Sequence, residues 1–196
     1  MARVDRSNNC RYYEKEMPEI GDVVMVKVTQ VTDTAAYADL LEYNGMEGML
    51  PFTELTRKGF IKSIAKFVKV GKLEVAQVLR VDKDKGYIDL SKKQVTAEER
   101  RQCEEMFAKS KVVHSIMVHG SLETEIPVTD IMTKVAWPLF KSHGHAFEAL
   151  KLEVTHPGTV FGALDVPEEL KSSLSKSIQH RLKVKPSRLR ADVEVT

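Results

Sequence analysis

The sequence predicts a β + α multidomain protein in which a small five-stranded antiparallel barrel is followed by an all-α helical domain. Three observations lead to this fold class. The first half holds five short segments rich in β-branched residues, and one long connection separates the third from the fourth. After residue 93 the hydrophobic period changes from that of strands to that of helices. With 42% hydrophobic residues in 196, the chain can bury a core.

The five strand segments differ in how they are joined. They are residues 22–31, 35–43, 44–52, 73–82 and 86–91. Asn44-Gly45 predicts a two-residue hairpin turn between the second and third. The turn before the fifth contains Gly86, which can take a positive φ. Five short strands with one long connection are typical of the OB fold, whose surface commonly binds oligonucleotides.

The long connection, residues 53–72, concentrates positive charge. It has no acidic residue after Glu54. Apolar side chains recur at helical spacing from Ile61 to Val68, which predicts a short amphipathic helix with its lysines turned to solvent. Cations on such a barrel attract phosphates by counterion release, without reading bases. The candidate RNA-contacting residues are Arg57, Lys58, Lys62, Lys66 and Lys69. The alternative is a solvated lysine face.

Thr56 stands at the mouth of this basic loop. A phosphate on its hydroxyl would bring about −1.5 to −2 charges into the cations at pH 7. It would pair with Arg57 or Lys58 and change the sign of the surface. Thr56 is therefore a candidate phosphoacceptor. The alternative is that Thr53 or Thr56 only caps a short helical turn.

The second half of the chain reads as helices. Thr96 and Glu99 have capping-box spacing, which predicts a helix start near Ala97. A further helix is expected to end at Gly120, and Pro138 is expected to bend or break another. The expected helices after Ala97 are 110–120, 128–144, 145–154 and 165–183. Residues 188–196 turn strand-like again, and because one strand cannot satisfy its own edges, the chain is interpreted as the front part of a longer protein.

No enzyme active site is evident in the sequence. Cys10 and Cys103 are far apart, which fits two reduced thiols in the cytoplasm better than a disulfide framework. His143 and His145 lack further ligands for a metal, so they are interpreted as structural. No cofactor is expected. No apolar run approaches the about 18 to 20 residues of a membrane span, so no membrane partner is expected.

The strand and helix segments together resemble a known family. GDVVMVKVTQV, LLEYN and RVDKDKGYIDLSKK resemble an S1-type OB domain, and AWPL and RLRADVEV resemble the later domains of the alpha subunits of eukaryotic translation initiation factor 2. The resemblance implies an arm, an S1 barrel, a helical domain and the first strand of a third, truncated α-β domain. Their boundaries are 1–17, 18–93, 94–185 and 186–196.

The resemblance also implies a function. A member of this family is a non-catalytic subunit that, with beta and gamma subunits, delivers initiator methionyl-tRNA to the small ribosomal subunit and lies near the mRNA. The gamma subunit would bind GTP and Mg²⁺, and would be held through the missing third domain. Stress-activated kinases phosphorylate a serine of the corresponding loop, and the modified factor inhibits its guanine-nucleotide exchange factor. That position matches Thr56.

The family's docking surface for kinase and exchange factor matches a second motif in this chain. It comprises Lys85, Gly86, Tyr87, Ile88 and Asp89. The sequence departs from the family at Thr56, where threonine replaces serine, and at Gly59-Phe60, where the loop is one residue longer. Two alternatives remain open: a stand-alone S1 RNA-binding protein, and a pseudosubstrate decoy of the regulatory kinase.

Overall fold

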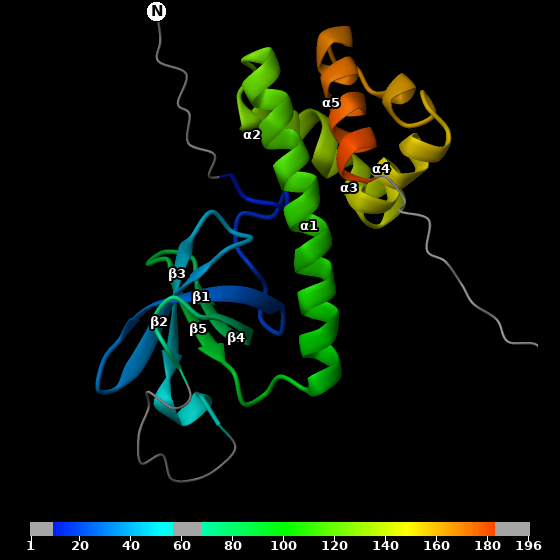
Figure 1. The fold of residues 1–196 in the computed structure, drawn as a ribbon. Coiled ribbons are helices and arrows are strands. Elements are labelled where there is room, and N and C mark those ends of the chain that lie inside the picture. The colour runs from blue at the N-terminus through cyan, green and yellow to red at the C-terminus, as the bar shows by residue number, and fades with distance from the viewer. Residues whose placement is uncertain (1–9, 57–67, 183–196) are drawn as a thin grey trace, which may run out of the picture.

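The first half of the chain closes into a five-stranded barrel. The computed structural model describes residues 10–56 and 68–182. The strands are β1 (Val23–Val31), β2 (Ala35–Leu40), β3 (Met46–Pro51), β4 (Leu73–Asp82) and β5 (Tyr87–Ser91), with a 3₁₀ turn η1 (Phe52–Glu54) after β3. Their order around the closed barrel is β1-β2-β3-β5-β4 (Figure 1). Neighbours pair antiparallel, apart from β3 and β5, which close the barrel in parallel. The predicted fold class is confirmed.

Side chains that point alternately to the two faces of β1 explain why this segment is a strand. Val24, Val26 and Val28 point into the barrel core, while Met25 points the other way. Met25 packs on Cys103 and other residues of the helical half. β1 is therefore covered on both sides over this stretch, by the core inside and by a helix outside.

Gly48 of β3 shows how tightly the barrel interior is filled. A Cβ at this position would lie 2.6 Å from Leu90 Cδ1 and 2.9 Å from Leu40 Cδ1. Both leucines are fully buried, so neither can move into solvent. A residue without a side chain is required here because the core is packed at crystal-like density.

The turn between β2 and β3 is larger than the sequence suggested. Leu40 pairs with Met46, so residues 41–45 form the connection rather than Asn44-Gly45 alone. Asn44 and Gly45 do carry the expected positive φ, at 58° and 70°. The two-residue hairpin was wrong because Glu42 and Tyr43 are buried in the turn, at 4% and 5% exposed. Contacts with other parts of the fold keep Glu42 and Tyr43 from pairing in the β2–β3 ladder.

A single long helix, α1 (Ala97–Thr124), begins the second half. The predicted capping box is confirmed, since the Thr96 side chain accepts from the Glu99 N–H and the Glu99 carboxylate accepts from the Thr96 N–H. The expected end at Gly120 was wrong: the helix continues through it. A Cβ there would lie 2.9 Å from Leu174 Cδ2, so Gly120 serves the close approach of another helix and not a helix end.

The remaining helices pack around the upper half of α1, as Figure 1 shows. They are α2 (Val128–Ile131), η3 (Met132–Ala136), α3 (Trp137–His143), α4 (Ala146–Thr155), η4 (Phe161–Ala163) and α5 (Glu168–Arg181). The interruption predicted at Pro138 is confirmed: η3 is a π-helical turn immediately before α3. Proline lacks the N–H that would continue the regular ladder. In the described residues, no helix has the length and apolar character that crossing a membrane requires.

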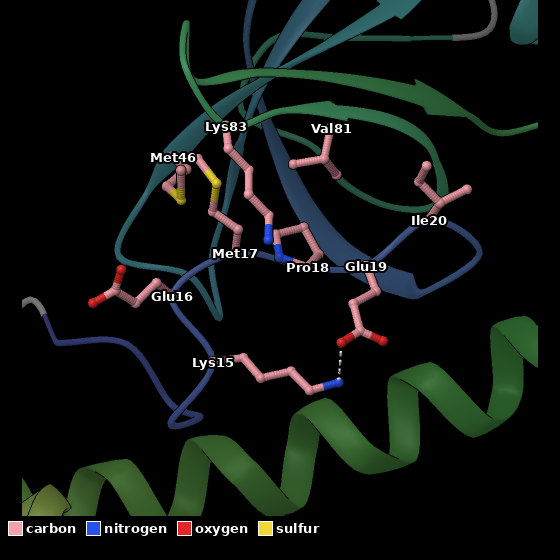
Figure 2. A pocket seen from close by; sticks show the side chains of 9 residues that line it. All are labelled: Lys15, Glu16, Met17, Pro18, Glu19, Ile20, Met46, Val81 and Lys83. Atoms are coloured by element: carbon pink, nitrogen blue, oxygen red, sulfur yellow. Dashed lines mark ion pairs between the residues drawn. The ribbon is translucent and has the colours of Figure 1, made fainter.

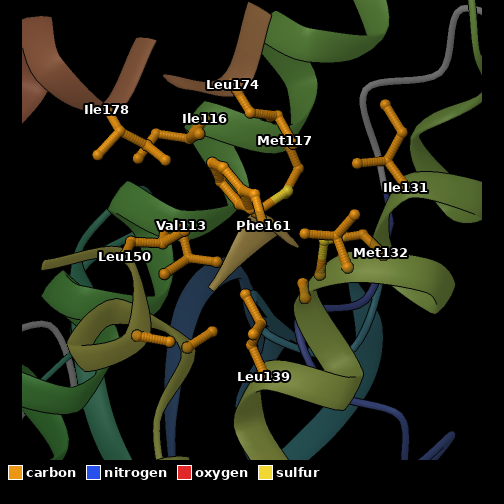
Figure 3. Close-up of a cluster of buried hydrophobic side chains, with 14 of the residues drawn as sticks. Val113, Ile116, Met117, Ile131, Met132, Leu139, Leu150, Phe161, Leu174 and Ile178 are labelled. Carbon is orange, nitrogen blue, oxygen red and sulfur yellow. The ribbon is translucent and has the colours of Figure 1, made fainter. Parts of the chain in front are cut away.

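The helical core is apolar and fully enclosed. Figure 3 shows side chains of α1, α2, η3, α3, α4, η4 and α5 meeting at its centre. Ile116, Met117, Ile131 and Leu174 are each completely buried. Cys10 belongs to the same cluster, so the described end of the expected N-terminal arm is anchored in the helical half.

Candidate nucleic-acid interface

Both described ends of the long connection are anchored at one end of the barrel. On one side, the Glu54 carbonyl accepts from the N–H groups of Lys92 and Lys93, both at 2.9 Å. On the other, Gly71 donates to the Val28 carbonyl at 2.7 Å, and Val68 is buried in the barrel core. The connection therefore leaves and re-enters the barrel at fixed points near the ends of β5 and β1.

Most of the predicted RNA-contacting residues belong to the part of the chain between these anchors. Arg57, Lys58, Lys62 and Lys66 lie outside the described residues, as does most of the expected amphipathic helix. Lys69 is described and exposed, one residue beyond the buried Val68. Of the predicted RNA-contacting residues, Lys69 is therefore the one that lies in the described part of the chain.

A carboxylate organises the N-terminal anchor next to Thr56. Lys93 Nζ donates to Glu54 Oε1 at 2.6 Å and to the Thr53 carbonyl at 3.0 Å. The buried Ser91 hydroxyl donates to Glu54 Oε2 at 2.7 Å. Burial acts to raise the pKa of Glu54, but the bonds from Lys93 and Ser91 outweigh it and hold the pKa below its ordinary value. The carboxylate stays ionised, which holds Lys93 at the loop mouth.

Thr56 is half-buried at this mouth, two residues after Glu54. In the sequence it directly precedes Arg57, the first cation of the basic segment. Sequence reasoning did not single out Glu54, Ser91 or Lys93. The signal for Ser91 and Lys93 was the SKK run at the end of the fifth strand, because a strand end in a barrel must lie beside its neighbours.

The predicted docking surface for kinase and exchange factor lies at the other end of the barrel. Residues 83–86 form the turn between β4 and β5, with Gly86 at φ 70° and the Lys85 N–H donating to Asp82 Oδ1 at 3.1 Å. The ten-residue β4 separates this turn from Lys72, a span of about 30 Å. The described C-terminal end of the basic loop and the docking motif therefore lie at opposite ends of β4.

Within the docking motif, the side chains have different surroundings. Lys85, Gly86 and Tyr87 are exposed, with Tyr87 at 66%. Asp89 is half-buried. Ile88 is 1% exposed and belongs to the barrel core, so its predicted place on a docking surface is corrected. Alternation along β5 accounts for this, since residues 87 and 88 point to opposite faces.

A pocket of about 720 Å³ lies beside this turn (Figure 2). Its walls are segment 15–20 on one side and Met46, Val81 and Lys83 on the other. The ion pair between Lys15 and Glu19, at 2.9 Å, lies along the rim. The hollow adds apolar surface beside the turn between β4 and β5, but nothing in its chemistry specifies a nucleic acid.

A chain of hydrogen bonds crosses the seam between barrel and helices. The Phe147 N–H donates to His145 Nδ1 at 3.0 Å, so the proton of the neutral ring is on Nε2. His145 Nε2 therefore donates to Ser110 Oγ at 3.2 Å, and the Ser110 hydroxyl donates to the Tyr13 oxygen at 3.0 Å. Tyr13 donates to Glu42 Oε1 at 2.7 Å.

This series of hydrogen bonds gives His145, one of the two histidines considered from the sequence, a structural role. Burial, together with the nearby Lys109, lowers the pKa of His145 and keeps the ring neutral. His145 caps α4, and His143 is exposed and hydrogen-bonded to Ser142. Within residues 10–56 and 68–182, no three histidine, cysteine, aspartate or glutamate side chains form a potential metal site.

Two family descriptions match separate parts of the chain. Residues 17–93 match the S1 RNA binding domain, and residues 131–196 match the eukaryotic translation initiation factor 2 alpha subunit. A homolog of that factor's subunit alpha from Arabidopsis thaliana is 43% identical over the whole of this chain. Subunit 1 of the factor from Dictyostelium discoideum is 48% identical over 96% of it. The chain spans 62% and 56% of the lengths of these two relatives.

Solved structures agree with this assignment. The intact alpha subunit of aIF2 from Pyrococcus abyssi is similar with a TM-score of 0.77 at 25% identity, over 87% of this chain and 65% of that one. The alpha subunit in a complex with aDim2p and rRNA from Pyrococcus horikoshii OT3 gives a TM-score of 0.70 at 25% identity, over 86% of this chain and 99% of that one. The barrel, the helices and the relatives matched along the whole sequence lead to one conclusion. The chain belongs to the family of alpha subunits of eukaryotic translation initiation factor 2.

Proposed function

We propose that this chain is a non-catalytic, RNA-contacting subunit of a translation initiation factor that brings initiator methionyl-tRNA to the small ribosomal subunit. The observation that carries the proposal is the match to alpha subunits along the whole chain, together with a basic loop anchored at both ends on an S1 barrel. The structure of a relative with rRNA supports RNA contact. The factor acts in the cytoplasm, with beta and gamma subunits as partners and GTP and Mg²⁺ on the gamma subunit.

The domain division is part of this proposal. We divide the chain into the arm 1–17, the barrel 18–93, the helical domain 94–185 and the start of a third domain at 186–196, which lies outside the described residues. The stand-alone S1 protein and the kinase decoy are less well supported, because each needs only a barrel. The match to subunit alpha relatives extends through the helices as well.

Initiator tRNA binding by the 196-residue chain tests the proposal. Fluorescence anisotropy is expected to show weak binding that falls steeply with salt, because the contacts are to phosphates. Replacing Lys62, Lys66 and Lys69 with alanine is expected to weaken it at least tenfold. The matched control replaces the helical-domain residues Lys151, Lys171 and Lys176 and is expected to bind like the parent.

Two results would count against this function. One is the absence of tRNA binding even at low salt. The other is sub-micromolar binding of single-stranded RNA that is insensitive to the triple loop substitution. That second result would favour the stand-alone S1 protein.

The regulatory part of the proposal concerns Thr56. A stress-activated, basophilic kinase is expected to place one phosphate on Thr56, and the modified chain is expected to bind the exchange factor more tightly. The negative charge of the phosphate would attract the loop cations and Lys93, which is held by Glu54. Mass spectrometry locates the phosphate, with Thr56→Ala as the negative control and Thr56→Ser as the positive one. Phosphate only on Ser63, or none in the Thr56→Ser variant, would contradict it.

A further inference from the structure

Three cations from three separate segments converge on one buried carboxylate at the loop end of the barrel. Glu74, 3% exposed, is the second residue of β4. Its Oε1 lies 3.0 Å from Lys72 Nζ, and its Oε2 lies 2.8 Å from Lys92 Nζ and 3.9 Å from Arg100 NH1. Lys72 precedes β4, Lys92 follows β5, and Arg100 is in the first turns of α1. We call this group the Glu74 cluster.

The Glu74 cluster carries surplus positive charge. Three cations and one carboxylate leave a net charge of +2. Three carboxylates on neighbouring segments are engaged elsewhere. Glu54 pairs with Lys93, Glu98 pairs with Arg101, and Glu99 accepts from Thr96 in the capping box. A negative partner from outside the cluster would be needed to balance the charge.

Two of the cations are both held in place and open to solvent. The Lys72 side chain is 59% exposed and that of Arg100 is 36% exposed, while that of Lys92 is 18% exposed. An ammonium has three donors and a guanidinium five, so one contact with Glu74 leaves donors for a second acceptor. Because Glu74 already limits their rotamers, binding a phosphate there costs less side-chain entropy.

The cluster is continuous with the basic loop. Lys72 donates its N–H to the Lys69 carbonyl at 3.1 Å, so the last loop lysine and the first cluster lysine share one turn. Lys92 donates its N–H to the Glu54 carbonyl, beside the other end of the loop. Positive charge therefore extends from the loop mouth across the end of the barrel to the start of α1.

We propose that the Glu74 cluster is a phosphate-binding site that extends the RNA path from the basic loop to the first turns of α1. Lys72 and Arg100 contact the RNA backbone, and Lys92 and Glu74 hold them in position. This inference rests on the proposed RNA contact and names further residues that carry it. A phosphate contact of this kind carries no base specificity.

The test is a salt titration of RNA binding by the 196-residue chain carrying Lys72→Ala or Arg100→Ala. Fluorescence anisotropy with labelled initiator tRNA and with an unstructured RNA oligonucleotide gives the affinity and its slope against salt. Each substitution is expected to weaken both RNAs about fivefold and to reduce the slope by about 0.7 to 0.9. Lys72→Arg is expected to retain binding. The matched control is Lys151→Ala, an ion-paired α4 lysine of similar exposure, at 55%.

The possible outcomes separate this inference from the function on which it rests. If the triple loop variant loses binding while Lys72→Ala and Arg100→Ala bind like the parent with an unchanged slope, the cluster is structural only and the inference is overturned. If the unmodified chain binds neither RNA, the proposed function itself fails. Circular dichroism melting confirms that each variant is folded, and Lys72→Glu, at an exposed position, supplies a second variant expected to weaken binding further.

Discussion

Replacing Glu74 with glutamine is expected to lower the free energy of unfolding by about 2 to 3 kcal/mol at pH 7. The carboxylate is almost fully buried and holds Lys72, Lys92 and Arg100, and thereby links β4, the segment after β5 and α1. An amide has no charge for these cations to pair with. Urea denaturation of parent and variant measures the difference.

The pH dependence of this effect has a definite sign. Burial acts to raise the pKa of Glu74, but the ion pairs with Lys92 and Lys72 outweigh it, and the pKa is lowered. A lowered folded-state pKa gives stability that is present above the ordinary value of 4.5 and is lost as pH falls through the folded value. The difference between parent and Glu74→Gln should therefore be full at pH 7 and shrink below pH 4.5.

Glu98→Gln is the matched control for this experiment. Glu98 also pairs with an arginine, Arg101 at 2.9 Å, but its side chain is 59% exposed. Exposed ion pairs contribute little, so this variant should unfold close to the parent. A Glu74→Gln variant as stable as the parent at pH 7 would show that the three cations need no carboxylate.

The same substitution at Glu42 is expected to have the opposite sign, raising the free energy of unfolding by about 1 kcal/mol at pH 7.5. Glu42 is 4% exposed, in the turn between β2 and β3. It accepts from the Tyr13 hydroxyl at 2.7 Å and from the Met25 N–H at 3.3 Å, two neutral donors. Glutamine keeps an oxygen acceptor for Tyr13 and removes a buried charge. Its NH2 group cannot accept from the Met25 N–H, and the loss of that long 3.3 Å bond is what keeps the expected gain small. Urea denaturation at several pH values measures the change.

The pKa of Glu42 fixes how this gain varies with pH. Burial raises it, and the bonds from Tyr13 and Met25 offset only part of the rise. Below the ordinary value of 4.5 the residue is protonated in both folded and unfolded chains, so its ionisation then costs nothing. As pH rises through the raised folded value the parent loses stability and Glu42→Gln does not. The advantage should therefore grow from pH 4.5 upward and then level off.

Tyr13→Phe is the companion variant for Glu42. It removes the donor to the carboxylate and the acceptor for Ser110, so it should destabilise the chain, and by less in the Glu42→Gln background. A Glu42→Gln variant that is less stable than the parent by a pH-independent amount would contradict this account, because charge would then not be the decisive term.

Local patterns predicted most of the elements and some of their limits. Valine alternation placed β1 within one residue, and the Thr96–Glu99 capping box placed the start of α1. Both signals depend on neighbours within a few positions of the chain. Gly120 was misread as a helix end because its reason, the approach of Leu174, lies 54 residues away in the sequence.

The candidate site also has a part that the sequence predicts and a part that only the structure reveals. The clustering of lysines between residues 57 and 69, the hydroxyl of Thr56 and the likeness to an alpha subunit are properties of the sequence alone. The Glu74 cluster is not, since Lys72, Lys92 and Arg100 become neighbours only when the barrel closes and α1 packs beside it.

By itself, the sequence determined a β-barrel followed by helices, a basic connection between the third and fourth strands, and the family. Only the tertiary structure decided which charges act together. Glu42 and Glu74 are the same residue type with similar burial, yet one meets two neutral donors and the other three cations. The pKa of a buried carboxylate depends on the groups within a few ångströms, and folding brings those groups from distant segments of the chain.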